Sequence, residues 1–174
     1  FELGAEGPLS KNSKASYIAN YRYSTLGVFQ ALGLNFGTGA AVPEYQDLTF
    51  KVDVPTKNAG RFTVFGIGGV SSIELLGSEE DLEGGNDNLF SSENSDDYVD
   101  YRTGIVGVSH LYYFNSTTSY KLSLAASRQE EHFYSDSLSI EDRTPIPSEE
   151  ADFINNKLSA HLMLNKKFSA RNNV

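Results

Sequence analysis

Strict alternation between two kinds of residue constrains the fold of this chain more than any other feature. In the clearest run, Tyr120, Leu122 and Leu124 alternate with Lys121 and Ser123. Successive side chains of a β-strand point to opposite sides of a sheet, so such a strand places one side in an apolar medium and the other in water. Similar runs begin at Ala15, Leu48 and Leu158. The pattern therefore predicts an all-β protein and gives helix almost no support.

The connections between the expected strands alternate in length. We expect strands near 1–8, 14–25, 47–56, 61–76, 98–114, 119–135 and 153–165. The long connections, expected to be outer loops, are 26–46, 77–97 and 136–152, and the first contains a helical candidate at 25–32. Outer-membrane barrels have short turns at one end and long loops at the other, whereas sandwiches more often have short connections at both ends. The layout predicts a segment of an antiparallel transmembrane β-barrel.

Seven strands cannot complete such a barrel. Closed single-chain barrels of bacterial type have an even number of strands. An open edge in lipid leaves backbone N–H and C=O groups without partners, which is costly. The chain also starts at Phe1 without Met, as a fragment or a mature product would. We therefore expect these strands to belong to a longer polypeptide, or another chain to supply the missing wall.

Aromatic residues gather near both ends of the expected strands. Those near the short turns are Phe62, Tyr112, Tyr113, Phe114, Tyr120 and Phe168. Those near the long loops are Tyr21, Tyr23, Tyr98, Tyr101, Phe133, Tyr134 and Phe153. Rings with a polar tip prefer the headgroup region, so a barrel would carry two aromatic bands. The general preference of Tyr and Phe for strands explains the same residues.

Composition excludes several functions. The chain has 14 Lys and Arg against 23 Asp and Glu, a net charge of −9. Binding nucleic acid requires clustered cations, so we expect no nucleic-acid partner. The absence of Cys excludes disulfides, thiolate metal sites and a Cys nucleophile. No segment has the roughly 20 consecutive apolar residues of a membrane-spanning helix.

The catalytic and zinc-binding motifs are weak. The segment Gly107-Val-Ser-His-Leu111 begins like a nucleophile elbow but lacks its last glycine, and Ser109 falls within an expected strand. His110, His132 and His161 lie on separate expected strands without ligand spacing, so we expect isolated polar residues of the lumen or loops. We therefore expect no enzyme and no catalytic residue.

The range 79–100 is strongly acidic. Asp87, Glu93, Asp96 and Asp97 offer the hard oxygen ligands that Ca²⁺ prefers, but their spacing does not match an EF-hand loop. A solvated outer loop explains the same residues. They are weak calcium candidates, and we expect no other cofactor.

Five segments of the first half have a distinctive combination of residues. They are Phe1-Glu-Leu-Gly-Ala-Glu-Gly-Pro-Leu-Ser10, Ser16-Tyr-Ile-Ala-Asn-Tyr-Arg-Tyr-Ser-Thr25, Gly37-Thr-Gly-Ala-Ala41, Pro43-Glu-Tyr-Gln-Asp-Leu-Thr-Phe50 and Gly60-Arg-Phe-Thr-Val-Phe-Gly66. With them, the range 1–78 resembles the front part of the barrel of TonB-dependent outer-membrane receptors, Bacteroidetes type, with a carboxypeptidase-regulatory-like domain. The tail Leu164-Asn-Lys-Lys-Phe-Ser-Ala-Arg-Asn172 resembles a periplasmic turn found further round such barrels.

The resemblance implies a barrel of about 22 strands in the outer membrane of a Gram-negative bacterium, with a plug inside. Such a receptor imports a nutrient, here unidentified, with energy passed through TonB. The implied partners are the lipid bilayer, the rest of the barrel, its plug and, through that missing plug, TonB. A surface lipoprotein or a larger outer-membrane complex is a further partner of some relatives. Two alternatives stay open: a structural or assembly subunit of such a complex, and a soluble β-sandwich that binds glycans.

The alternation also sorts side chains into two sets. We expect Asn20, Arg22, Lys51, Asp53, Lys121, Ser159 and His161 to face the lumen. We expect Tyr17, Tyr21, Phe50, Val52, Leu122, Leu124, Leu158 and Leu162 to face lipid. In a plugged barrel, lumen-facing residues bind the plug or border the transport path, although wetting the lumen explains them equally well. The lumen-facing set is the best candidate for a functional role.

Overall fold

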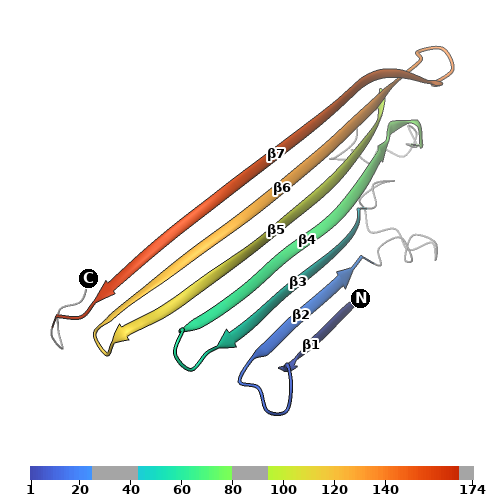
Figure 1. Cartoon of the computed structure of the whole chain (residues 1–174). Coiled ribbons are helices and arrows are strands. Elements are labelled where there is room, and N and C mark those ends of the chain that lie inside the picture. The colour runs from blue at the N-terminus through green and yellow to red at the C-terminus, as the bar shows by residue number, and fades with distance from the viewer. Residues whose placement is uncertain (25–42, 80–93, 169–174) are drawn as a thin grey trace.

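The computed structural model describes residues 1–24, 43–79 and 94–168, which form one antiparallel sheet of seven strands (Figure 1). The strands are β1 (Glu2–Pro8), β2 (Ser16–Tyr23), β3 (Glu44–Pro55), β4 (Arg61–Leu76), β5 (Ser95–Asn115), β6 (Thr118–Leu138) and β7 (Pro145–Lys166), with a 3₁₀ turn, η1 (Gly77–Glu79), after β4. Each strand pairs with its neighbours in sequence. The predicted all-β class and antiparallel sheet are confirmed. The sheet is open, because β1 and β7 do not pair with each other.

The connection between β6 and β7 differs from the prediction. β6 continues to Leu138 and β7 starts at Pro145, so the expected outer loop 136–152 is wrong and only 139–144 join the strands. Pro145 and Pro147 lie within β7. β7 is an edge strand of the described sheet. An edge strand accepts Pro because the backbone on its outer side forms no hydrogen bonds with a neighbouring strand.

The other two expected long loops lie mostly outside the described residues. The structure does not describe 25–42 and 80–93, which include the helical candidate 25–32. Beside these gaps, β3 and β5 start three residues earlier than the sequence predicted. The described part of the chain contains no helix long and apolar enough to cross a membrane.

The turn between β3 and β4 requires a glycine. Gly60 has a φ of 78°, in the left-handed region that residues with a Cβ rarely adopt. Its carbonyl accepts a hydrogen bond from the Thr56 backbone N–H at 2.8 Å. A Cβ at Gly60 would also lie 2.3 Å from the carbonyl oxygen of Leu111. Glycine therefore permits the short turn that starts β4 against β5.

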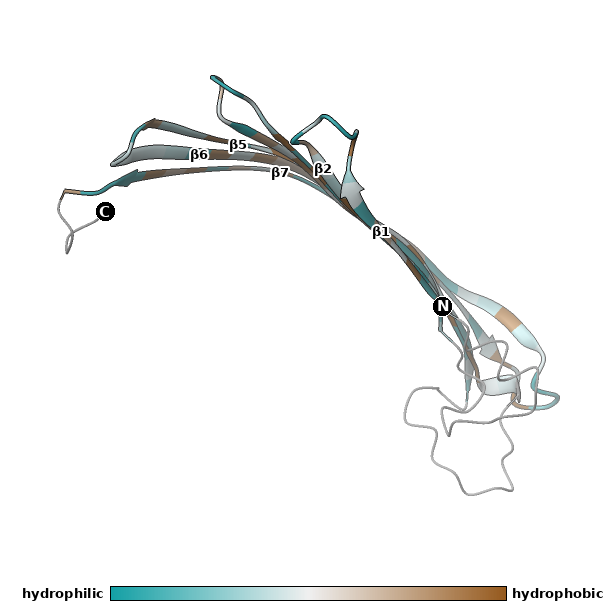
Figure 2. Cartoon of the chain, turned by 90° about the horizontal axis from the view of Figure 1, so that it is seen from below, coloured by the Kyte–Doolittle hydropathy of each residue, from teal (hydrophilic) through white to brown (hydrophobic). Residues whose placement is uncertain are grey.

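The described sheet is a single curved layer (Figure 2). Ala15 is the one buried apolar residue within the described ranges. Many large apolar side chains remain exposed: Val106 is 54% exposed and Leu162 is 59% exposed. A single layer has no second surface against which to bury its side chains. The described strands therefore lack a hydrophobic core of their own.

Phenylalanine rings cover two glycines within the strands. An ideal Cβ on Gly66 would lie 2.5 Å from the Phe50 ring, and one on Gly107 would lie 2.4 Å from the Phe65 ring. The absence of a side chain lets each ring lie flat across the neighbouring strand. This packing accounts for glycines in strands that otherwise favour larger residues.

Candidate functional site

Strand pairing defines two faces of the sheet. One row of paired residues joins Tyr17, Val52, Val64, Val108 and Leu124, and we call the side that carries it the apolar face. The opposite side, the polar face, carries a row that joins Asp53, Thr63, Ser109, Ser123 and His161. All eight residues expected to face lipid lie on the apolar face, and all seven expected to face the lumen lie on the polar face.

The apolar face carries a band of hydrophobic side chains across β3 to β7. Alternate residues of Leu48–Val54, Phe62–Val70, Val106–Phe114, Tyr120–Ala126 and Leu158–Leu164 form this band. Toward the long-loop ends of the strands the band stops at Gln46, Ser72, Arg102, Arg128 and Asn156. The same face is therefore apolar along one part of each strand and polar along the rest.

Rings gather where this band reaches the short turns. Phe62 stacks on His110 with ring centroids 4.2 Å apart, and Tyr112, Phe114 and Tyr120 surround this pair. His110 Nε2 lies 2.6 Å from the carbonyl oxygen of Ala59, and Nδ1 lies 2.9 Å from the Tyr120 hydroxyl. The neutral tautomer that donates from Nε2 satisfies both contacts. His110 therefore lies within β5, on the same face as the residues expected to face lipid and opposite the expected lumen set.

The second expected aromatic band is not a single row. Tyr21, Tyr23, Tyr98 and Tyr134 lie on the apolar face, whereas Tyr101, Phe133 and Phe153 lie on the polar face. Tyr98 pairs with Tyr134 well beyond the apolar band, at the long-loop ends. The prediction considered distance along each strand but not the side from which each ring projects.

The expected lumen residues near β1 to β4 make ionic contacts with neighbouring strands. Arg22 forms an ion pair with Asp47 at 2.8 Å. Asp53 forms a longer ion pair with Arg61 at 3.3 Å and accepts a hydrogen bond from the Thr63 hydroxyl at 2.8 Å. These contacts link β2 with β3 and β3 with β4, so part of the expected functional set also stabilises the sheet.

The remaining members of that set lie elsewhere on the polar face, with Lys51 on β3 between Ile18 of β2 and Phe65 of β4. Asn20 donates from its side-chain amide to Glu2 on β1, while its own Oδ1 is buried without a partner among the described residues. Lys121, on β6, lies one strand from Ser159 and His161, on β7. The seven expected residues therefore share one face but do not converge on one site.

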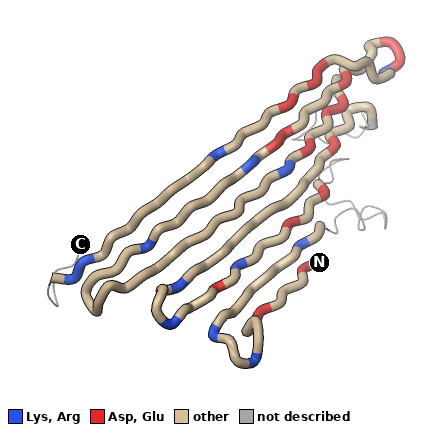
Figure 3. Tube along the Cα trace, viewed as in Figure 1, with Lys and Arg blue, Asp and Glu red and all other residues tan. Residues whose placement is uncertain are grey.

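Opposite charges alternate across the sheet beyond the band. The row Asp100, His132 and Asp152 joins β5, β6 and β7, and His132 Nδ1 lies 2.8 Å from an Asp152 carboxylate oxygen. The hydrogen bond to Asp152 raises the pKa of His132 above its ordinary 6.5, and the charges of Asp152, Glu150 and Asp100 act in the same direction. Acidic residues predominate at these long-loop ends, whereas Lys and Arg gather at the short-turn ends (Figure 3).

The calcium candidates lie partly outside the described residues. Asp87 and Glu93 fall in the range that is not described. Asp96 accepts hydrogen bonds at 2.8 Å from the backbone N–H and the hydroxyl of Ser78, and Asp97 accepts from Ser95 and Ser135. Asp96 therefore fastens η1 to β5. Within the described ranges, no three His, Asp or Glu side chains are arranged to hold a metal ion.

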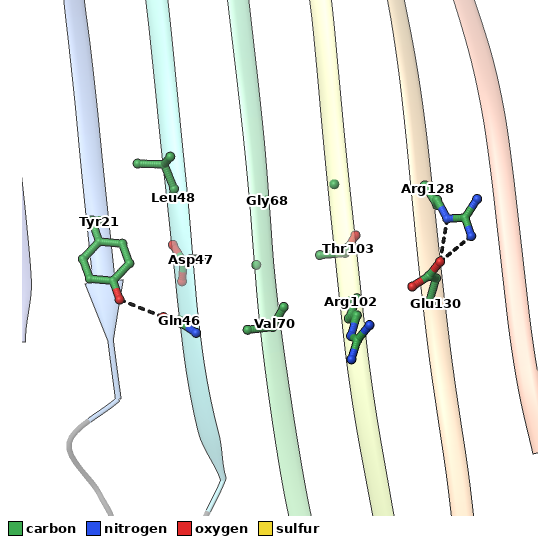
Figure 4. Close-up of a pocket in the computed structure, with 12 residues that line it drawn as sticks. Tyr21, Gln46, Asp47, Leu48, Gly68, Val70, Arg102, Thr103, Arg128 and Glu130 are labelled. Carbon is green, nitrogen blue, oxygen red and sulfur yellow. Dashed lines mark hydrogen bonds and ion pairs between the residues drawn. The ribbon is translucent and has the colours of Figure 1, made fainter. Parts of the chain in front are cut away.

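Sequence reasoning missed the arginines at the edge of the band. Arg102 and Arg128 lie on the apolar face directly beyond its hydrophobic residues, at one end of a hollow of about 490 Å³ (Figure 4). The available signal was Arg128, which interrupts the alternation two residues after Ala126. No family model, curated protein or solved structure matches this chain.

Proposed function

We propose that this chain forms part of the wall of a transmembrane β-barrel, in a TonB-dependent outer-membrane receptor that imports a nutrient. The observation that carries this proposal is the apolar band, which continues across five strands and stays open to its surroundings. Leu124 is 46% exposed and Leu158 is 86% exposed. At ~25 cal/mol per Å², so much exposed apolar area favours a hydrocarbon environment over water. The polar face would then line the hydrated lumen.

The length of the band is near the lower limit for a strand that spans a bilayer. It covers about seven to nine residues on each of β3 to β7, and a tilted spanning strand needs roughly 9–11. The cluster around His110 forms one end of the band, and Arg102, Arg128 and Asn156 border the other end. Aromatic and cationic side chains are well suited to these two interfaces.

The transport role rests on the resemblance of residues 1–78. The structural alternative, a barrel that serves only as a scaffold in a larger complex, has the same wall. The soluble sandwich alternative would need a second layer over the apolar face, and residues 1–24, 43–79 and 94–168 contribute one layer only. We therefore place the transporter first and the scaffold second.

Single cysteines test which face meets lipid. The chain has no Cys of its own, so Leu122→Cys, Leu124→Cys and Ser123→Cys can be compared in the full-length polypeptide after any other cysteines are removed. We expect a water-soluble maleimide to label the Ser123→Cys variant and to spare the two variants of the band. Bimane attached in denaturant and refolded into vesicles should be quenched by brominated lipid at 122 and 124 only. Equal labelling and quenching at all three positions would contradict the proposal.

Crosslinking to TonB separates the transporter from the scaffold. In cells, the full-length polypeptide should form a formaldehyde crosslink with TonB if it is a transporter. A polypeptide that sediments with the outer membrane, gives the face-specific labelling above and never crosslinks to TonB would be assigned to the scaffold role.

A further inference from the structure

Three hollows on the apolar face join into one groove. The first, of about 490 Å³, lies at the polar limit of the band, and the second, of about 790 Å³, shares Leu48, Gly68, Gly104 and Arg128 with it. The third, of about 530 Å³, continues from the second through Val106, Ala126 and Leu158. The groove therefore runs from charged side chains at one end to a lining that is apolar apart from Ser159 at the other.

Glycines form the floor where the polar and apolar parts meet. Gly68 and Gly104 are paired across β4 and β5. A Cβ on Gly104 would meet no atom within 4 Å, and one on Gly68 would meet only the backbone of β5, at 3.5 Å or more. These two glycines differ from Gly66 and Gly107, which Phe rings cover. Their missing side chains leave open space that a bound molecule can occupy.

Cationic and hydrogen-bonding groups surround the polar end (Figure 4). Arg102 and Arg128 line the first hollow, and across it the Tyr21 hydroxyl donates to the Gln46 side chain at 2.8 Å. Arg128 donates from Nε to Glu130 at 2.6 Å and forms an ion pair with it. Arg102 forms no salt bridge within the described ranges, although Glu130 faces it on β6. Asp47 also lines the hollow, but its carboxylate is paired with Arg22 on the polar face. Glu130 is therefore the carboxylate that competes for the two arginines.

The chemistry of this groove matches one class of molecule. Guanidinium groups bind phosphate oxygens through paired N–H donors, more effectively than neutral donors do. The groups on Tyr21 and Gln46 suit the hydroxyls of a sugar, and the apolar residues that line the second and third hollows suit acyl chains. In the proposed orientation, the polar end lies toward the long loops, where the outer leaflet of the outer membrane carries phosphorylated glycolipid.

We infer that this groove binds a phosphorylated glycolipid, with a phosphate at Arg102 and Arg128 and acyl chains along Val106, Ala126 and Leu158. The inference rests on the proposed barrel, because only a barrel would present this face to an outer leaflet. Glu130 weakens the site by holding Arg128. It follows that removing the Glu130 charge should strengthen binding, whereas removing the arginines should weaken it.

Native mass spectrometry in detergent can count bound glycolipid on the full-length polypeptide. The probe is diphosphorylated lipid A, with its fully dephosphorylated form as the matched ligand. We expect the double variant Arg102→Gln/Arg128→Gln to lower affinity for the phosphorylated probe about tenfold or more, and Glu130→Gln to raise it. Lys57→Gln, which removes a cation in the β3–β4 turn, should leave affinity unchanged.

Gly104→Leu tests the groove without changing charge. The space above Gly104 admits a side chain, so the variant should fold, keep its heat-modifiable mobility on gels and lose bound lipid A. Undiminished binding by the arginine double variant or by folded Gly104→Leu would overturn the inference. Equal binding of dephosphorylated lipid A, or tighter binding of phosphatidylglycerol, would overturn it as well.

The cysteine experiment separates this inference from the proposed function. Positions 122 and 124 could meet lipid while 123 does not, and the arginine double variant could still bind lipid A with unchanged affinity. In that case only the proposal of a glycolipid site is contradicted. If the two faces label equally, the barrel fails and the glycolipid site fails with it.

Discussion

A charge placed on alternate residues of β6 gives the sharpest test of the two faces. Leu124 lies in the middle of the apolar band, between Val108 on β5 and Ala160 on β7. Ser123 is its neighbour in sequence and lies on the polar face, between Ser109 and His161. Lysine at either position would lie at the same depth in the bilayer. The two substitutions therefore introduce the same charge at the same depth on opposite faces.

The expected difference is large. Lysine at the midplane on the lipid side of a barrel costs roughly 2–4 kcal/mol. Since about 1.4 kcal/mol is a factor of ten in an equilibrium, Leu124→Lys should lower the folding constant by about 30- to 700-fold. In the proposed barrel, Ser123→Lys would keep its charge in a hydrated lumen beside other polar groups, so it should cost less than about 1 kcal/mol.

Reversible unfolding in guanidinium, with the full-length polypeptide in lipid vesicles, measures both free energies. Leu122→Lys and Leu162→Lys repeat the test on the apolar face, one on β6 and one on β7. A Leu124→Lys variant no less stable than Ser123→Lys would refute the assignment of the apolar face to lipid. If only Ser123→Lys strongly lowered the free energy of unfolding, the polar face would instead be the one in contact with hydrocarbon.

Three further results are expected. Gly66→Val should destabilise the sheet by about 1–3 kcal/mol in the same unfolding assay, because its Cβ meets the Phe50 ring, whereas Gly104→Ala should be nearly neutral. Gly60→Ala should cost about 1–2 kcal/mol or more, since the φ of 78° is strained for alanine, and an unchanged midpoint would count against this turn geometry. His132, which lies outside the apolar band, should titrate by NMR above 6.5, and Asp152→Asn should lower its pKa. Because that pKa is raised on folding, the pair should stabilise the sheet at low pH and lose this contribution as pH rises through the raised value, so a titration unaffected by Asp152→Asn would exclude the pairing.

The alternation of apolar and polar residues was enough to predict the strands but not the residues at which they begin and end. Alternation such as that from Tyr120 to Leu124 reports on which side chains share a face, and strand pairing places the predicted sets on two faces. Pro145 and Pro147 lie in the range predicted to be the last long loop, yet both belong to β7. Whether a proline breaks a strand depends on whether its missing N–H would face a neighbour, and this depends on the position of the strand within the sheet.

The amino-acid sequence by itself determined that the chain forms antiparallel strands with one apolar and one polar side, because that information is carried by residues two positions apart. Only the tertiary structure decided which residues of different strands share a row. The pairing places His110 among the aromatic rings near the short turns and Arg102 and Arg128 beside one hollow. It also places the second set of aromatic residues on both faces of the sheet. The reason is physical: the register between strands is set by pairing along their whole length, and a single strand contains no record of its neighbours.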